Sequence, residues 1–172
     1  YKKNRKTNLN PMRPNLLNLD ESPLPAWDLL NMKHYTANRF FASRVVTMNT
    51  SRGCLFKCSF CFNQGLPHQK WRGLSAKNIL NQINYLYKNY NINGIQFYED
   101  SFDTNKKRVS EFSDLMIQGG LNSKIKWSHF SNIPYFNEDL VSYEKKAGLR
   151  YIEYGVESGS QRILDWINKR QT

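Results

Sequence analysis

The chain carries three cysteines, and all of them lie in one window of eight residues. They are Cys54, Cys58 and Cys61 in the stretch TSRGCLFKCSFCFN, with three residues between the first two and two residues between the last two. Three crowded thiols are a poor disulfide framework, because one stays unpaired and any bridge closes a very small loop. The pattern therefore favours a reducing compartment and a metal centre, since the thiolate is a metal ligand.

Two kinds of metal centre are compatible with three thiolates. A structural zinc ion needs four ligands, and His68, seven residues beyond Cys61, is the candidate for the fourth. The spacing argues against zinc, whose sites usually combine two well-separated pairs of ligands. An electron-transfer iron–sulfur cluster needs a fourth thiolate, which this chain lacks. The remaining candidate is a 4Fe-4S cluster whose fourth iron is open to a substrate.

The elements that must position these thiols are visible in the hydrophobic pattern. From residue 44 onward, short β-branched or aromatic runs alternate with amphipathic helical runs. Four such units indicate a parallel sheet with helices packed on it, because parallel strands need crossover connections. We expect strands at 44–49, 94–100, 124–131 and 150–157, with helices at 75–90, 106–118, 137–147 and 160–169. Ser75 and Asn137 are the expected helix N-caps.

The carboxyl ends of parallel strands are where reactive groups gather in such folds. This rule selects four places: the cysteine window, Glu99 with Asp100, residues 128–132 and residues 155–159. All four should open on one face of the sheet. Ser128 and His129 are weaker candidates on the third strand, where His129 is equally suited to the core.

The charge of the chain is strongly positive, at +11 from 25 basic and 14 acidic residues. Such a balance fits nucleic acid, an anionic membrane or an acidic partner. The first seventeen residues hold five basic residues and no acidic one, so a solvated basic tail is favoured over a nucleic-acid surface. No apolar run approaches the roughly 20 residues of a membrane-spanning helix. We expect a cytoplasmic protein without a membrane partner, and a linker over residues 1–25.

The cysteine window resembles the CxxxCxxC signature of the radical S-adenosylmethionine enzymes, including an aromatic residue, Phe60, directly before the last cysteine. The resemblance implies an α/β fold, a partial TIM-type barrel with about four of six strand–helix units present. Residues 41–172 would form the core, incomplete at its C-terminal end. Residues 1–40 would be a linker or approach segment.

The same resemblance implies a chemistry. Cys54, Cys58 and Cys61 would hold a 4Fe-4S cluster, and S-adenosylmethionine would bind its free iron. Reductive cleavage would yield a 5′-deoxyadenosyl radical that abstracts hydrogen from an unknown substrate. A small flavodoxin- or ferredoxin-type protein would donate the electron. The nearby Arg44, Arg52 and Lys57 would favour the reduced cluster, unless they are simply solvated loop charges.

Two further segments resemble motifs of the family. In GIQFYEDSF, residues 94–102, Glu99 and Asp100 resemble an acidic pair of the cobalamin-associated branch, and either carboxylate is suited to the methionine amine. The alternative is an exposed pair at a strand end. In YGVESGSQRIL, residues 154–164, Glu157 and Ser158 would reach polar groups of S-adenosylmethionine. Alternatively, Ser158 or Ser160 would cap the following helix, and Glu157 would favour its N-terminal dipole.

The segment before the first strand points to a branch of the family. LDESPLPAWDLLNMKHY, residues 19–35, resembles the join between a cobalamin-binding domain and the radical core in enzymes that methylate unactivated carbons or cyclise. This implies a cobalamin-dependent methyltransferase or cyclase whose cobalamin is held by a domain outside this chain. A methylthiotransferase-like enzyme, a small zinc-stabilised binding module for nucleic acid, and a metal-free interaction domain are the alternatives.

Overall fold

A computed structural model describes residues 2–3, 6–7, 9–11, 14–65 and 70–172 of the chain. Its centre is a five-stranded sheet in the order β3-β4-β7-β8-β9. Four strands run parallel, and β3 pairs antiparallel with β4 at one edge. The strands are β3 (Ala37–Arg39), β4 (Ala42–Met48), β7 (Gly94–Phe97), β8 (Lys126–Ser131) and β9 (Leu149–Tyr154).

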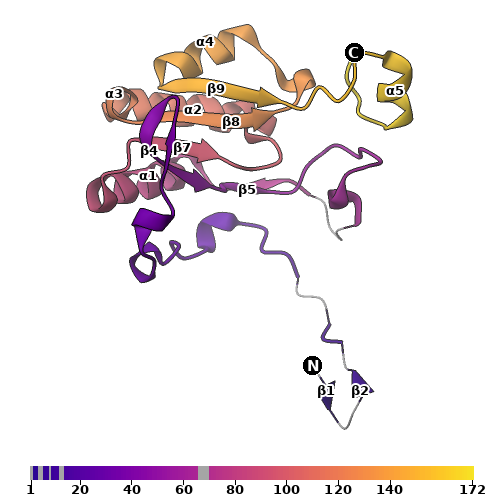
Figure 1. The fold of residues 1–172 in the computed structure, drawn as a ribbon, viewed down its shortest axis with the longest axis horizontal. Helices are drawn as coiled ribbons and strands as arrows, with labels where there is room; N and C mark the ends of the chain where they lie inside the picture. Colours follow the sequence, from indigo (N-terminus) through magenta and orange to yellow (C-terminus); the bar gives the residue numbers. More distant parts are fainter. Residues whose placement is uncertain (1, 4–5, 8, 12–13, 66–69) are drawn as a thin grey trace.

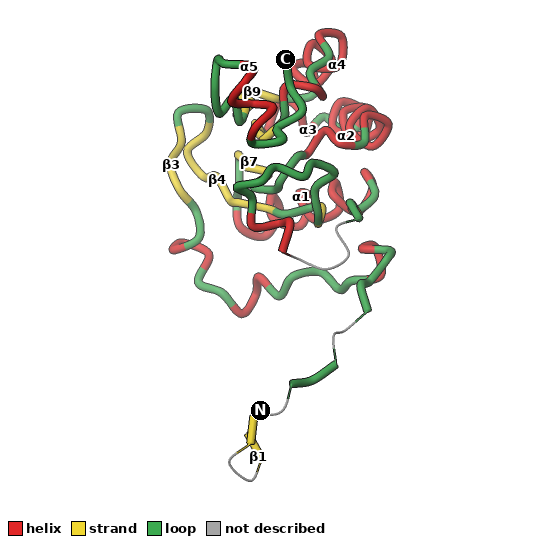
Figure 2. Tube along the Cα trace, turned by 90° about the vertical axis from the view of Figure 1, so that its right-hand side faces the viewer, coloured by secondary structure: helices red, strands yellow, loops and turns green. Residues whose placement is uncertain are grey.

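The helices α1, α2, α3 and α4 lie along one face of the sheet, and α5 lies beyond the carboxyl end of β9, as Figures 1 and 2 show. The helix α1 packs on α2, and α2 packs on α4. Four strand–helix units therefore stand side by side, which confirms the predicted partial barrel. The helices are α1 (Ala76–Tyr90), α2 (Lys106–Gln118), α3 (Leu121–Lys124), α4 (Glu138–Lys146) and α5 (Gln161–Trp166). None of the described helices is long and apolar enough to cross a bilayer.

Two small strand pairs lie outside this sheet. The strands β1 (Lys2–Lys3) and β2 (Lys6–Thr7) form a hairpin that stands apart from the body in Figure 1. The strands β5 (Ser51–Arg52) and β6 (Arg72–Gly73) pair antiparallel on either side of the cysteine loop. Single 3₁₀ turns connect the larger elements: η1 (Leu19–Glu21), η2 (Trp27–Leu29), η3 (Met32–His34), η4 (Phe62–Gly65), η5 (Phe102–Thr104) and η6 (Ile133–Tyr135).

The predicted helix caps are confirmed, while the strand boundaries differ from the predicted ones, most of all at the ends of the second and fourth strands. The Ser75 hydroxyl accepts a hydrogen bond from the Asn78 amide at 3.2 Å, and the Asn137 side chain accepts one from the Leu140 amide at 2.8 Å. The second strand ends at Phe97, because residues after it turn toward the cysteine loop. The fourth strand ends at Tyr154, which leaves residues 155–160 as a loop.

The core between the sheet and α2 is aromatic. Phe97, Phe102, Phe112 and Trp127 are fully buried. Phe97 stacks on Phe102 with their ring centroids 4.3 Å apart, and it meets Phe112 and Trp127 edge-on at 5.7 and 5.8 Å. Because Phe97 is the last residue of β7, this packing fixes the place where the chain leaves the sheet toward the predicted acidic pair.

The segment before the sheet docks on α1 through Trp27, whose ring stacks on Tyr85 of α1 at 5.7 Å. Trp27 and Met32 are both buried in the main hydrophobic core. Leu30, between them in the chain, is 41% exposed, because the 3₁₀ turns here lack the period of an α-helix.

The turn between β3 and β4 bends over the face of the sheet that the helices leave open. Its Phe40 meets Tyr151 of β9 edge-on, with ring centroids 5.3 Å apart. The strand β9 lies at the opposite edge of the sheet from β3. The β3–β4 hairpin therefore connects the two edge strands, β3 and β9, on the face of the sheet that the helices leave open. This contact lies near the amino ends of the parallel strands.

We predict that replacing Phe97 with alanine lowers the free energy of unfolding by about 3–5 kcal/mol, because the cavity would open in the middle of the aromatic core. Phe40→Ala is the matched control. Phe40 is 79% exposed, so its loss should change stability by about 0.5 kcal/mol or less. Chemical denaturation of the full-length variants measures both, and equal losses would contradict this description of the core.

Candidate functional site

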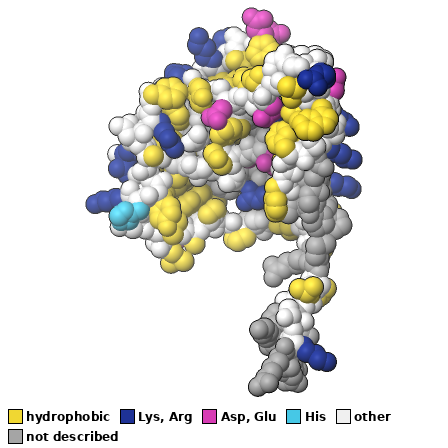
Figure 3. Space-filling model, turned by 45° about the vertical axis from the view of Figure 1, so that its right-hand side comes forward, with side chains coloured by type: hydrophobic (Ala, Val, Ile, Leu, Met, Phe, Trp, Pro, Cys, Tyr) yellow, Lys and Arg dark blue, Asp and Glu magenta, His cyan; other side chains and the backbone are white. Residues whose placement is uncertain are grey.

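A pocket of about 720 Å³ opens at the carboxyl ends of the parallel strands. Its wall contains Asn49 after β4, Asp100 after β7, Asn132 after β8 and Gly155 after β9. The four places selected from the sequence therefore meet at one pocket, as predicted. Figure 3 shows the hollowed face, where hydrophobic side chains lie among both acidic and basic ones. The volume suits a cofactor-sized ligand.

The cysteine loop begins at Gly53 and forms one side of this pocket. Gly53 has φ +88°, and a Cβ there would lie 2.8 Å from the Lys70 carbonyl oxygen, so glycine is required. Cys54 lines the pocket, Cys58 is buried and Cys61 is half-buried, and no disulfide joins any of the three. The Cys61 amide donates to the Cys58 carbonyl at 3.0 Å, which places these two residues on one turn.

The three cysteines influence one another electrostatically. Burial raises the pKa of the Cys54 thiol, and the charges of Asp100, Cys58 and Cys61 raise it further. Burial also raises the pKa of Cys58, with Cys61 adding to the effect and Lys169 opposing it. Three thiolates in this loop would therefore repel one another, and a bound cationic centre would relieve the repulsion.

The donor set fits a cluster better than a single ion. Within the described ranges, no three His, Cys, Asp or Glu side chains converge on a point where one metal ion could bind. His68, the predicted fourth zinc ligand, lies outside the described residues. In an iron–sulfur cluster the thiolates hold separate irons, so their sulfurs need not converge on one point.

The two members of the predicted acidic pair differ sharply in their surroundings. Glu99 is buried, and its carboxylate accepts hydrogen bonds from the Thr50 amide at 3.2 Å, from the Thr50 hydroxyl at 2.6 Å and from the Ser51 hydroxyl. The Arg108 guanidinium lies 3.9 Å from it. Protein groups thus occupy the oxygens of Glu99, which ties β7 to the start of the cysteine loop.

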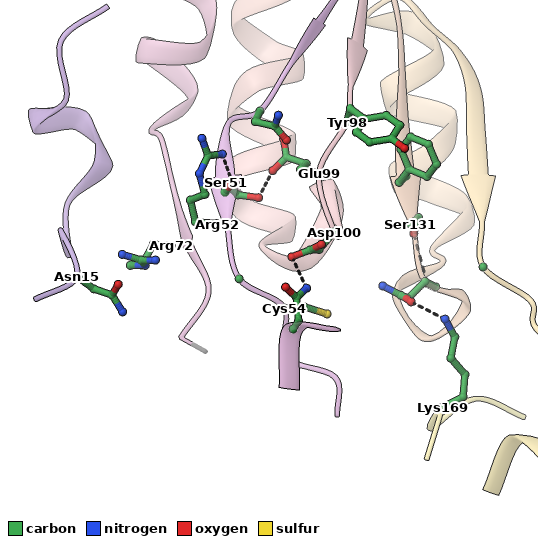
Figure 4. A pocket seen from close by; sticks show the side chains of 16 residues that line it. Asn15, Ser51, Arg52, Cys54, Arg72, Tyr98, Glu99, Asp100, Ser131 and Lys169 are labelled. Carbon is green, nitrogen blue, oxygen red and sulfur yellow. Dashed lines mark hydrogen bonds between the residues drawn. The ribbon is translucent and has the colours of Figure 1, made fainter. Parts of the chain in front are cut away.

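Asp100 is exposed and lies beside Cys54 in Figure 4. Its Oδ2 accepts one hydrogen bond from the Asn63 amide group at 2.8 Å. Asp100 therefore keeps acceptor capacity toward the pocket. Of the two carboxylates, Asp100 is the one that can accept hydrogen bonds from a cationic ligand, whereas Glu99 stabilises the wall of the pocket.

The remaining predicted cofactor-binding residues border the pocket without lining it. Glu157 has φ 62°, and its Oε1 accepts a hydrogen bond from Lys169 Nζ at 3.1 Å. The Ser158 hydroxyl accepts a hydrogen bond from the Ser160 amide at 3.1 Å. Ser160 is the N-cap residue of α5 and makes no side-chain cap hydrogen bond, so Ser158 contacts the cap residue but does not itself cap the helix. Phe60 is 57% exposed on the cysteine loop.

Arg44 was predicted to lie near the cysteines, and this is wrong. Its guanidinium donates to the Tyr90 and Asn91 carbonyls at 2.8 and 3.1 Å, at the end of α1. Arg44 stands near the amino end of β4, whereas the loop follows the carboxyl end of that strand. Its charge therefore stabilises the C-terminus of a helix rather than a metal centre.

Ser128 and His129 do not line the pocket either. His129 lies in the core, 3.5 Å from the Glu144 carboxylate, with both side chains 1% exposed. Burial alone would lower the pKa of His129, but the Glu144 carboxylate outweighs it and the pKa is raised. The alternative that His129 is a core residue thus agrees with the structure.

Sequence reasoning missed the C-terminal segment as part of the site. The Ser59 amide donates to the Ile167 carbonyl at 2.8 Å, and the Asn168 side chain donates to the Lys57 carbonyl at 2.8 Å. This docking brings Lys169 into the pocket wall, where its Nζ reaches Asn132 Oδ1 at 3.3 Å. No periodic or motif signal marks Lys169, because only the fold brings it beside the cysteine loop.

Comparison with known proteins supports this picture. Residues 48–172 match the model of the Radical SAM superfamily. An uncharacterized methyltransferase of Pyrococcus horikoshii, PH0819, is 38% identical over 169 residues, covering 98% of this chain and 36% of its own length. The anaerobic magnesium-protoporphyrin IX monomethyl ester cyclase of Cereibacter sphaeroides is 31% identical over 150 residues, covering 86% of this chain and 24% of its own.

A solved structure shows the same arrangement. The apo form of the cobalamin-dependent S-adenosylmethionine radical enzyme OxsB matches with a TM-score of 0.65 at 26% identity, covering 90% of this chain and 23% of that chain. Another structure of OxsB holds aqua-cobalamin and S-adenosylmethionine. This chain spans only about a third or less of the length of these proteins. Its cysteine loop, its parallel sheet and the family match together show that the chain belongs to the radical SAM superfamily.

Proposed function

We propose that this chain is the radical core of a cobalamin-dependent methyltransferase or cyclase that uses S-adenosylmethionine. The observation that carries the proposal is the loop of three reduced thiols beside a pocket at the carboxyl ends of parallel strands. The relatives named as a methyltransferase and a cyclase, and the likeness to OxsB, support the branch. A part of the protein outside these residues would hold the cobalamin.

Three residues would hold a 4Fe-4S cluster: Cys54, Cys58 and Cys61. When bound, the cluster supplies the electron that cleaves S-adenosylmethionine reductively, so the hard chemistry belongs to the cofactor. The protein holds the loop in place on two sides. Glu99 fixes its start through Thr50, and the Ile167 carbonyl fixes its middle through the Ser59 amide.

The pocket residues would bind and orient S-adenosylmethionine. Asp100 would accept hydrogen bonds from the methionine amine, because it is the carboxylate exposed to the pocket. Glu157 and Ser158 would reach polar groups of the ligand from the loop that follows β9, whose Gly155 is in the pocket wall. Phe60 would shield the cysteine loop from solvent, and this shielding matters for a reactive intermediate.

The reaction would take place in the cytoplasm, where thiols stay reduced. We propose a small flavodoxin- or ferredoxin-type protein as the electron donor. The net charge of +11 supports an acidic donor, because opposite charges speed diffusional encounter. The substrate would bind in the same pocket.

We predict that anaerobic reconstitution of the full-length protein yields about four irons and four sulfides for this site. Cys58→Ala should abolish the cluster, because a buried ligand is lost, whereas the neighbouring Ser59→Ala should retain it. Iron and sulfide analysis with electron paramagnetic resonance of the reduced protein measures this. Stoichiometric zinc with no uptake of iron would instead favour a zinc-stabilised binding module.

We also predict that Asp100 contributes to ligand binding and Glu99 to stability. Asp100→Asn should weaken S-adenosylmethionine binding about tenfold, because a charged hydrogen-bond partner is lost, with little change in stability. Glu99→Gln should lower the free energy of unfolding by on the order of 3 kcal/mol, because Arg108 would stay buried without its counter-charge.

Equilibrium dialysis with S-adenosylmethionine and chemical denaturation, both on the full-length variants, separate the two effects. The wild-type protein is the reference, and each of the two variants serves as the matched control for the other. A Glu99→Gln protein of normal stability that fails to bind S-adenosylmethionine would reverse the assignment.

A further inference from the structure

Two arginines face each other on one wall of the pocket. Arg52 and Arg72 are directly opposite in the antiparallel pair β5–β6, and both line the pocket. Figure 4 shows them on the side of Asn15, with Cys54 in the middle and Lys169 on the opposite side. Like charges directly opposite each other destabilise a strand pair. This arrangement therefore needs a third group to offset the repulsion.

The described residues supply no counter-charge for this pair. Neither arginine takes part in an ion pair within the described ranges. The residues outside those ranges include no Asp or Glu in the sequence. The hydrogen bonds of the two guanidinium groups go to main-chain carbonyls instead, from Arg52 to Ser51 and from Arg72 to Leu16, each at 2.8 Å.

A second observation concerns the donors of Arg72. Its Nε is buried and has no hydrogen-bond partner among the described residues. A buried donor left unsatisfied costs about 1–3 kcal/mol, so the guanidinium is not fully accommodated by protein groups. The contact with Leu16 meanwhile holds the side chain in place. The Arg72 guanidinium is thus held in place and still has an unpaired donor, so it can bind an acceptor that is not part of the chain.

The other charged side chains in the wall have protein partners. Glu99 is paired with Arg108, and Lys169 with Glu157. Asp100 is assigned above to the methionine amine. Arg52 and Arg72 are thus the cationic wall residues that lack an acidic partner in the described structure. A 4Fe-4S core held by three thiolates carries a net negative charge, and S-adenosylmethionine offsets it, because its sulfonium and amine outweigh its one carboxylate. The two cofactors together therefore leave the arginine pair without a full counter-charge.

We propose that Arg52 and Arg72 form an oxyanion subsite that binds a carboxylate or phosphate group of the substrate. Guanidinium groups recognise these planar or tetrahedral oxyanions with paired hydrogen bonds. The proposal rests on the proposed function for the position of S-adenosylmethionine and assigns the substrate to the class of acidic molecules. The anion would bridge the two arginines and so relieve their repulsion.

Inorganic phosphate is the probe for the test. It is titrated calorimetrically into the reconstituted full-length protein at saturating S-adenosylmethionine. Arg52→Gln and Arg72→Gln should each weaken phosphate binding tenfold or more and leave the affinity for S-adenosylmethionine within about threefold, since one charged hydrogen-bond partner is lost. Arg150→Gln is the matched control, because Arg150 also donates to the carbonyl of its preceding residue, at 2.7 Å, but lies outside the pocket wall.

Two results would overturn the subsite. One is phosphate affinity that is absent in the wild type or unchanged in both variants. The other is an equal loss of S-adenosylmethionine affinity, which would assign the arginines to the carboxylate of that ligand. Arg52→Gln should fold normally, because the one hydrogen bond described for Arg52 goes to the carbonyl of the preceding residue. This variant therefore keeps the test valid if Arg72→Gln misfolds. A protein without iron uptake would contradict the proposed function instead, and the phosphate titration would still report on the arginine pair.

Discussion

The site depends on one buried charge, the carboxylate of Glu99. It joins the end of β7 to the Thr50 amide and hydroxyl at the start of the cysteine loop, and Arg108 compensates it from α2. Arg108 is itself held by the Phe102 carbonyl at 2.7 Å and by the faces of two aromatic rings. A buried carboxylate is strongly destabilising when it loses its partners. The core, the end of β7 and the cysteine loop must therefore fold together.

This coupling explains how three cysteines whose thiolates would repel one another can share one loop. The loop is fixed at Thr50 by Glu99, before the first cysteine, and at Ser59 by the Ile167 carbonyl, between Cys58 and Cys61. Folding therefore sets the positions of the thiols, and the repulsion between their ionised forms is left for a bound cationic centre to relieve. In this arrangement the affinity for a cluster and the stability of the loop support each other.

Those parts of the structure that rest on local or periodic signals were predictable from the sequence. The Ser75 and Asn137 caps, the four strand–helix units and the meeting of strand ends at one pocket all follow from such signals. The strands β5 and β6 do not, because two residues carry no period. The part of Lys169 in the pocket wall comes from tertiary contacts more than a hundred residues apart in the chain. For the same reason, sequence could nominate Glu99 and Asp100 as a pair but could not say which one is buried.

The two ends of the sheet differ in what they present. The β3–β4 turn meets β9 through Phe40 and Tyr151 near the amino ends of the strands, whereas the pocket opens at their carboxyl ends. Both S-adenosylmethionine and substrate would then enter past the same rim. That rim carries the Arg52–Arg72 pair next to the main chain of Leu16. An acidic substrate would meet this pair on entry, and binding there would orient its remainder toward the cysteine loop.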